Sequence, residues 1–126
     1  MSNSLRADLQ ELVDKYKLIQ AHLNNKLNIS GPIYSKGDVV TQYDEISHMI
    51  GRFEDRLKTK DEGMLDIKIL GLIQKFERCC EEEVSTSSAR ERSKVWEMTI
   101  LDLTNIRNEY YKDSRQQTRQ IVVRKV

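Results

Sequence analysis

The sequence predicts an all-α protein, most simply an antiparallel four-helix bundle. Apolar residues recur at alternating intervals of four and three, the spacing that keeps side chains on one stripe of a helix. The 126-residue chain has one proline and five glycines, so long segments run without a helix breaker. Charged residues make up 33% and apolar residues 38% of the chain, which is typical of amphipathic helices around one small core. A helical hairpin that pairs with a second chain is the alternative arrangement.

The first predicted helix covers residues 4–27 and has a narrow apolar seam. Ser2 or Ser4 can cap it, because a hydroxyl oxygen accepts hydrogen bonds from the free N–H groups of the first turn. Ser30-Gly31-Pro32 predicts a break after it, since proline lacks an N–H group and favours extended geometry in the residue before it. The seam consists of Leu5, Leu9, Leu12, Tyr16, Ile19 and Leu23.

The second predicted helix covers residues 38–59 and repeats the narrow seam. Asp38 is expected at its N-cap, where a carboxylate suits the positive end of the helix dipole. Gly51 lies inside this helix at a cost of about 1 kcal/mol relative to alanine, which a close approach of a neighbouring helix would explain. The short turn at 60–63 favours an antiparallel neighbour. The seam consists of Val39, Tyr43, Ile46, Ile50, Phe53 and Leu57.

The third predicted helix covers residues 64–84 and is apolar over a wider arc, so it should contact more than one neighbour. Met64, Ile67 and Leu70 fall outside its main stripe. The fourth predicted helix covers residues 88–112. Its stripe consists of Val95, Trp96, Ile100, Leu103, Ile106 and Tyr110, and we expect Met98 and Leu101 to point away from it. The surplus apolar residues of both helices predict a second contact surface, within the bundle or with a partner.

Residues 1–113 are therefore predicted as the bundle domain, and residues 114–126 as a basic C-terminal tail. The tail contains four cations and no acid, and its last six residues are rich in β-branched side chains, which favours an extended backbone. Ile121 and Val123 would suit strand addition to the edge of a partner's sheet. The alternatives are a frayed terminus or contacts with nucleic acid or a membrane surface.

The sequence predicts no enzyme, because it contains no phosphate-binding loop, nucleophile elbow or metalloprotease signature. No catalytic, cofactor-binding or metal-ligating residue is predicted, and His22 and His48 are expected on the surface. Cys79 and Cys80 are expected to pack beside Phe76 as small apolar residues, with redox or lipidation roles as the alternative.

Other features of the sequence bear on location. The N-terminus lacks the apolar stretch of a secretory signal, no apolar run is long enough to span a membrane, and two adjacent cysteines cannot build a disulfide framework. The sequence predicts a cytoplasmic protein, with a nuclear location as the alternative. The net charge of +1 points to no bulk attraction for nucleic acid.

These observations predict a non-enzymatic interaction module, a small helical adaptor or assembly subunit whose partner is a protein, with a homodimer as one form. The alternative is a nucleic-acid-binding accessory protein that uses the basic tail. Trp96 is expected in the core, with a partner hot spot as its alternative role. The predicted partner-binding residues are Trp96, Met98, Leu101, Tyr111, Arg115, Arg119, Ile121, Val123, Arg124 and Lys125.

Overall fold

Four α-helices make up the structure. This computed structural model describes residues 4–28, 36–82 and 87–125, without the side chains of 36, 87, 88 and 113–125, and no strand occurs in those ranges. The helices are α1 (Leu5–Asn28), α2 (Lys36–Leu57), α3 (Glu62–Glu82) and α4 (Ser87–Lys125). The predicted all-α fold with four helices is confirmed. The first three helices begin and end within two residues of the predicted positions.

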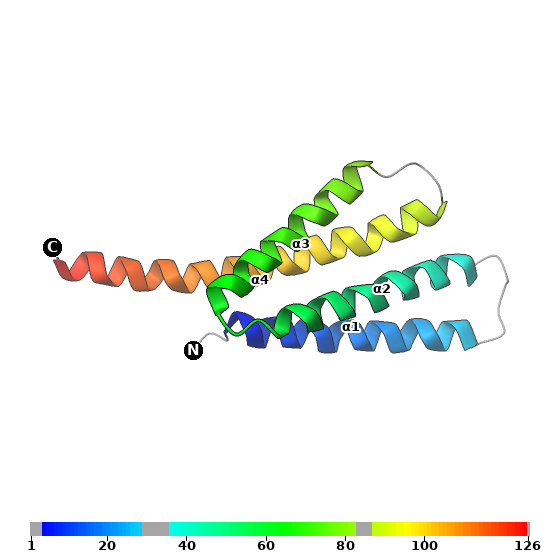
Figure 1. Cartoon of the computed structure of the whole chain (residues 1–126), viewed down its shortest axis with the longest axis horizontal. Coiled ribbons are helices and arrows are strands. Elements are labelled where there is room, and N and C mark those ends of the chain that lie inside the picture. The colour runs from blue at the N-terminus through cyan, green and yellow to red at the C-terminus, as the bar shows by residue number, and fades with distance from the viewer. Residues whose placement is uncertain (1–3, 29–35, 83–86, 126) are drawn as a thin grey trace.

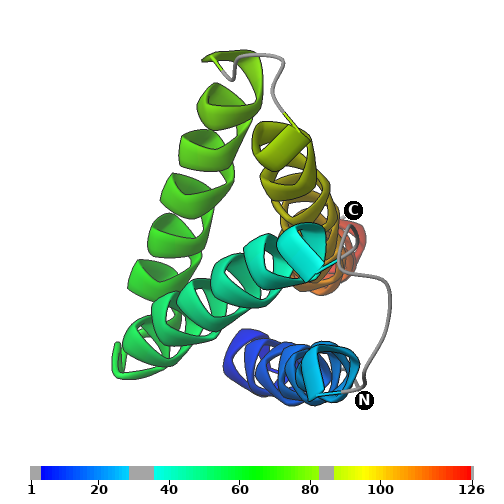
Figure 2. The ribbon, with the colours of Figure 1, turned by 90° about the vertical axis from the view of Figure 1, so that its right-hand side faces the viewer.

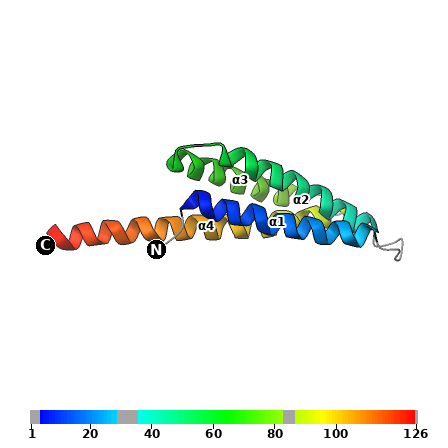
Figure 3. The ribbon, with the colours of Figure 1, turned by 90° about the horizontal axis from the view of Figure 1, so that it is seen from below.

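The helices form two pairs. α1 and α2 lie side by side along their length, and α3 lies beside α4 (Figure 1). α2 and α3 diverge from the turn that joins them, so their other ends lie apart (Figure 2). α4 contacts each of the other three helices, and it continues past the N-terminal end of α1 (Figure 3).

Apolar side chains from all four helices form one core. Both predicted seams face it, with their members buried or half-buried. Within it the rings of Tyr16 and Phe53 lie 5.2 Å apart, and those of Phe76 and Trp96 stack at 6.3 Å. The core explains why amphipathic helices of this kind fold at all, because an isolated helix of this length is marginally stable in water.

Hydrogen bonds connect the ends of α1, α2 and α3. The Ser4 hydroxyl accepts a hydrogen bond from the N–H of Ala7 at 3.0 Å, which confirms Ser4 as a cap of α1. A carboxylate oxygen of Glu62, at the start of α3, accepts from the first N–H groups of α1. The Arg6 guanidinium donates to the carbonyls of Leu57, the last residue of α2, and of Thr59 and Lys60 just past it, and cations are favoured at this end of a helix.

The expected start of α2 is corrected. α2 begins at Lys36, so Asp38 lies within its first turn and the prediction of Asp38 as the N-cap is wrong. A carboxylate suits the helix dipole anywhere in the first turn, so the residue type alone does not give the exact start. The predicted break at Ser30-Gly31-Pro32 lies outside the described residues.

The C-terminal segment also differs from its prediction. Residues 114–125 continue α4 as a helix, so the extended tail is wrong, and strand addition through Ile121 and Val123 would lack the extended backbone that it needs. Neither glycine nor proline occurs from residue 87 to the end. Adding one residue to an existing helix gains one hydrogen bond without a new nucleation step. Arginine, glutamine and lysine are good helix formers, and they outweigh the short β-branched run.

Gly51 has open space around it. A Cβ atom built there would meet nothing within 4 Å, so the expected close helix approach is absent. We expect Gly51→Ala to raise the free energy of unfolding by about 0.5–1 kcal/mol, because alanine loses less backbone entropy in a helix. Urea denaturation followed by circular dichroism measures this gain. A loss of stability would contradict an open environment at this position.

Candidate functional site

The C-terminal part of α4 extends past the other three helices (Figures 1 and 3). α4 has 39 residues, whereas α1, α2 and α3 have 24, 22 and 21. We call residues 114–125 the arm. No other described helix runs beside the arm in these views, and its sequence contains four basic residues and no acid. The arm is therefore a basic helix presented away from the body of the protein.

Three residues at the base of the arm form a polar clamp between α3 and α4. Arg107 Nε donates to Asp66 Oδ1 at 2.7 Å, and Arg107 Nη2 donates to Asp66 Oδ2 at 3.3 Å. The Tyr111 hydroxyl donates to Asp66 Oδ2 at 2.6 Å and accepts from Arg107 Nη2 at 3.1 Å. The guanidinium also lies 5.1 Å from the centre of the Tyr111 ring. The bidentate arrangement fixes the angle between the two helices more firmly than a single contact would.

The clamp stabilises the charged form of Asp66. Burial alone would raise the pKa of Asp66, but hydrogen bonds from Arg107 and Tyr111 outweigh that effect and hold the pKa below its ordinary value of 3.8. The bonds to Asp66 in turn raise the pKa values of Arg107 and Tyr111. All three groups are therefore in their bonded protonation states at neutral pH. The base of the arm is therefore bound to α3 by an ion pair and hydrogen bonds.

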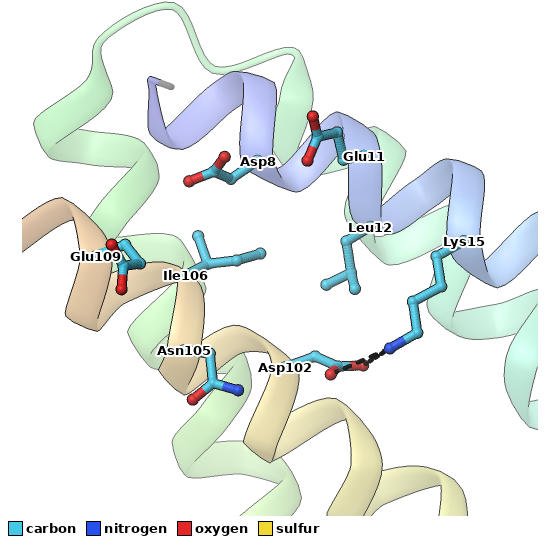
Figure 4. Close-up of a pocket in the computed structure, with 8 residues that line it drawn as sticks. All are labelled: Asp8, Glu11, Leu12, Lys15, Asp102, Asn105, Ile106 and Glu109. Carbon is cyan, nitrogen blue, oxygen red and sulfur yellow. Dashed lines mark hydrogen bonds and ion pairs between the residues drawn. The ribbon is translucent and has the colours of Figure 1, made fainter. Parts of the chain in front are cut away.

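A groove of about 400 Å³ lies between α1 and α4, next to the base of the arm (Figure 4). Leu12 of α1 and Ile106 of α4 contribute apolar surface, and polar side chains surround them. The polar lining consists of Asp8, Glu11, Lys15, Asp102, Asn105 and Glu109. Figure 4 shows that the residues come from both helices and that Leu12 and Ile106 point toward each other across the space between them.

The groove is acidic. It contains four carboxylates and one ammonium group, and the ammonium of Lys15 lies 3.3 Å from Asp102. Asp8, Glu11 and Glu109 have no ion-pair partner in the described part of the chain. Apolar surface ringed by unpaired carboxylates favours a ligand with both positive charge and apolar groups.

A buried hydrogen-bond network lies beneath the groove. Tyr16 is fully buried, and its hydroxyl donates to Asp102 Oδ2 at 2.9 Å and contacts Thr99 Oγ1 at 3.1 Å. Burial, above all, raises the pKa of Tyr16, and the charge of Asp102 adds to the increase. Tyr16 is therefore protonated at any ordinary pH and can always donate to Asp102. This bond, together with Lys15, fixes the position of Asp102 at the edge of the groove.

The predicted partner-binding residues of α4 that precede the arm differ in how deeply they are buried. Trp96 is 7% exposed, stacks on Phe76 and donates from Nε1 to Glu45 at 3.1 Å, which agrees with the core interpretation. Met98 is half-buried and packs against the core, so it does not point away from the stripe as expected. Leu101 is 61% exposed and does point away. Tyr111 is 38% exposed and belongs to the clamp.

The remaining predicted residues lie on the arm. The backbone there is helical. Their side chains lie outside the described residues. These residues are Arg115, Arg119, Ile121, Val123, Arg124 and Lys125.

The positions of the cysteines and histidines agree with those predicted from the sequence. Cys79 and Cys80 are half-buried free thiols that pack against the core. Burial, and then the charge of Glu97, raise the pKa of the Cys80 thiol, which disfavours the reactive thiolate. His22 and His48 are exposed on α1 and α2. Among the described residues, no three His, Cys, Asp or Glu side chains gather as metal ligands, and no helix is long and apolar enough to cross a membrane.

Sequence reasoning missed both the clamp and the groove. A partial signal for the groove exists in the spacing, because Asp8, Glu11 and Lys15 border the first seam. Asp102, Asn105 and Glu109 follow the same spacing beside the stripe of α4. The spacing places each set on one edge of a helix, but it does not show that the two edges meet.

Comparison of the chain with known protein families, with curated proteins and with solved structures finds no match in any of the three.

Proposed function

We propose that this protein is a non-enzymatic interaction module, a small helical adaptor or assembly subunit that binds a protein partner through the arm. The observation that carries the proposal is the projection of a basic helix beyond the other three helices (Figure 1). A helix of about 12 residues is marginal by itself in water. Packing on a partner would supply the contacts that stabilise it. The body of the module, in this proposal, is an antiparallel four-helix bundle.

The clamp supports the proposal because it sets the direction of the arm. Asp66 is 6% exposed and binds both Arg107 and Tyr111, which lie just before the arm on α4. A helix that is held at its base loses less entropy on binding than a free segment of the same sequence. The arm is thus preorganised for recognition.

Exposed apolar residues on α3 and α4 offer further contacts. Ile67 is as exposed as Leu101, and Met64 is half exposed. We propose them as additions to the arm, not as the primary surface. The free thiols of Cys79 and Cys80 suit a reducing compartment, which supports cytoplasmic placement, with the nucleus as the alternative.

Removing the arm tests this function. We expect a chain of residues 1–113 to keep the thermal transition of the core, because it retains every core side chain that the structure describes. We also expect it to lose the proteins that the full chain captures and cross-links in extracts of its native source. The matched control is the full chain with Arg115, Arg119, Arg124 and Lys125 replaced by glutamine, which keeps helix propensity and removes charge. If all three chains capture the same proteins, the proposal is wrong.

The second candidate function is nucleic-acid binding, which the four cations of the arm favour. The same three chains distinguish it. Fluorescence anisotropy with a DNA duplex and a single-stranded RNA would then show affinity that falls steeply with salt and disappears with the arm. Weak binding that is equal for all three chains would contradict it. The arm contains no aromatic residue to stack on bases, so protein binding is the proposal that we favour.

A further inference from the structure

We propose that the partner of the arm is a second copy of this chain, whose groove between α1 and α4 receives it. The inference rests on the proposed function, because it requires that the arm binds protein. It goes further by naming the surface that the arm contacts. Each copy then provides one arm and one groove to a two-fold symmetric dimer.

Charge complementarity is the first argument. The arm has four positive charges and no negative charge in its sequence. The groove has a surplus of three negative charges, and Asp8, Glu11 and Glu109 have no ion-pair partner among the described residues. Opposite patches of this kind attract one another and select the register of docking. The net charge of +1 hides this asymmetry, because the two patches almost cancel in the whole chain.

Apolar content is the second argument. The groove presents Leu12 and Ile106 between its carboxylates. The arm contains Ile121, Val122 and Val123 among its cations. Burial of apolar surface supplies affinity, whereas exposed ion pairs alone contribute little. A purely charged ligand such as a metal ion would leave the apolar part of the groove unused.

The third argument is the position of both elements on one helix. The groove lies along α4 between Asp102 and Glu109, and the arm begins a few residues later. Their midpoints are about 14 residues apart, or about 21 Å at 1.5 Å per residue. A two-fold axis near residue 112 therefore places each arm along the groove of the other copy. Both sites are filled, and the assembly closes.

The arm cannot fill the groove of its own chain. It continues α4 in the same direction, away from the part of α4 that lines the groove (Figure 3). Folding back would require a break in the helix, and no glycine or proline is present to make one. A second copy supplies the same chemistry without such a break.

Charge reversal in two separate chains tests the inference. The groove variant carries Asp8→Lys, Glu11→Lys and Glu109→Lys, and the arm variant carries Arg115→Glu, Arg119→Glu and Arg124→Glu. In sedimentation equilibrium we expect the wild type to be a dimer that weakens with salt. Each variant alone should show a dimer dissociation constant at least about tenfold higher, because repulsion replaces attraction. An equimolar mixture of the two variants should dimerise again, since both of its arm–groove contacts are complementary.

A control variant with Asp14→Lys, Asp44→Lys and Glu77→Lys makes the same charge change at exposed sites outside the groove, and it should remain a dimer. Circular dichroism of every variant checks that the helices are intact. Failure of the mixture to dimerise overturns the inference, and so does a wild type that stays monomeric. If the arm-deleted chain nevertheless loses its captured proteins, the proposed function stands and only the identity of the partner is wrong. If the arm-deleted chain loses nothing, both fail.

Discussion

Phe76→Ala is expected to lower the free energy of unfolding by about 3–5 kcal/mol, the usual cost of emptying a buried phenylalanine site. Phe76 is 2% exposed and lies where α3 meets the rest of the core. Its ring stacks on Trp96 and lies within 6 Å of the Arg52 and Lys75 cations. Since α3 diverges from α2, few other side chains can replace this contact.

Urea denaturation measures the loss, and the fluorescence of Trp96, the single tryptophan, reports on the same region. Ile67→Ala is the matched control, because Ile67 lies on the same helix and is exposed; it should change stability by less than about 0.5 kcal/mol. If the alanine variant does not fold, Phe76→Leu is measured instead, with an expected loss of about 1–2 kcal/mol. Equal effects at Phe76 and Ile67 would contradict the packing of α3 described here.

Asp66→Ala is expected to cost about 2–4 kcal/mol, because it leaves the Arg107 guanidinium without its carboxylate partner. The Arg107 side chain is 19% exposed, so water replaces the lost bonds only in part. Tyr111 loses its acceptor at the same time. Asp44→Ala, at an exposed position of α2, is the matched control and should be close to neutral. A double-mutant cycle with Arg107→Met separates the coupling of the pair from the effects of each residue.

The stability that the clamp contributes should also depend on pH. The pKa of Asp66 is lower in the folded protein than its ordinary value of 3.8, so the clamp contributes its full stability above that value. The contribution falls as the pH drops through 3.8 towards the folded pKa, because in this range the unfolded chain binds a proton at Asp66 that the folded protein does not bind. We therefore expect the stability difference between wild type and Asp66→Asn to be constant near neutral pH and to shrink in acid. A constant difference down to about pH 2 would contradict the charged clamp.

The apolar seams could be predicted from the sequence because each depends only on residues of a single helix. The apolar residues from Leu5 to Leu23 and from Val39 to Leu57 recur at helical spacing. Such a repeat indicates which face of each helix is buried. The conformation of the C-terminal end of α4 could not be predicted in the same way. The β-branched run at 121–123 favoured an extended backbone, but continuation of a helix already formed outweighed that preference.

The polar sites could not be predicted from the sequence, because they depend on which helices pack together. No sequence pattern distinguishes Asp66 from the other acidic residues. Only the packing of α3 on α4 places it against Arg107 and Tyr111. Met98 shows the same dependence, since its position on the wheel of α4 suggested exposure, whereas contact with the core half-buries it. A helical wheel describes one helix, and the partner of each face comes from the assembly of all four.

The amino-acid sequence by itself determined the all-α class, the number of helices, most of their ends and most residues of the core, because local spacing and helix breakers encode them. Tertiary structure decided which edges meet. It brought the acidic edges of α1 and α4 together as a groove, clamped α3 to α4 through Asp66, and left the arm projecting beyond the body (Figure 3). The physical reason is range: helix periodicity acts over a few residues, whereas the groove joins residues about 90 positions apart in the chain.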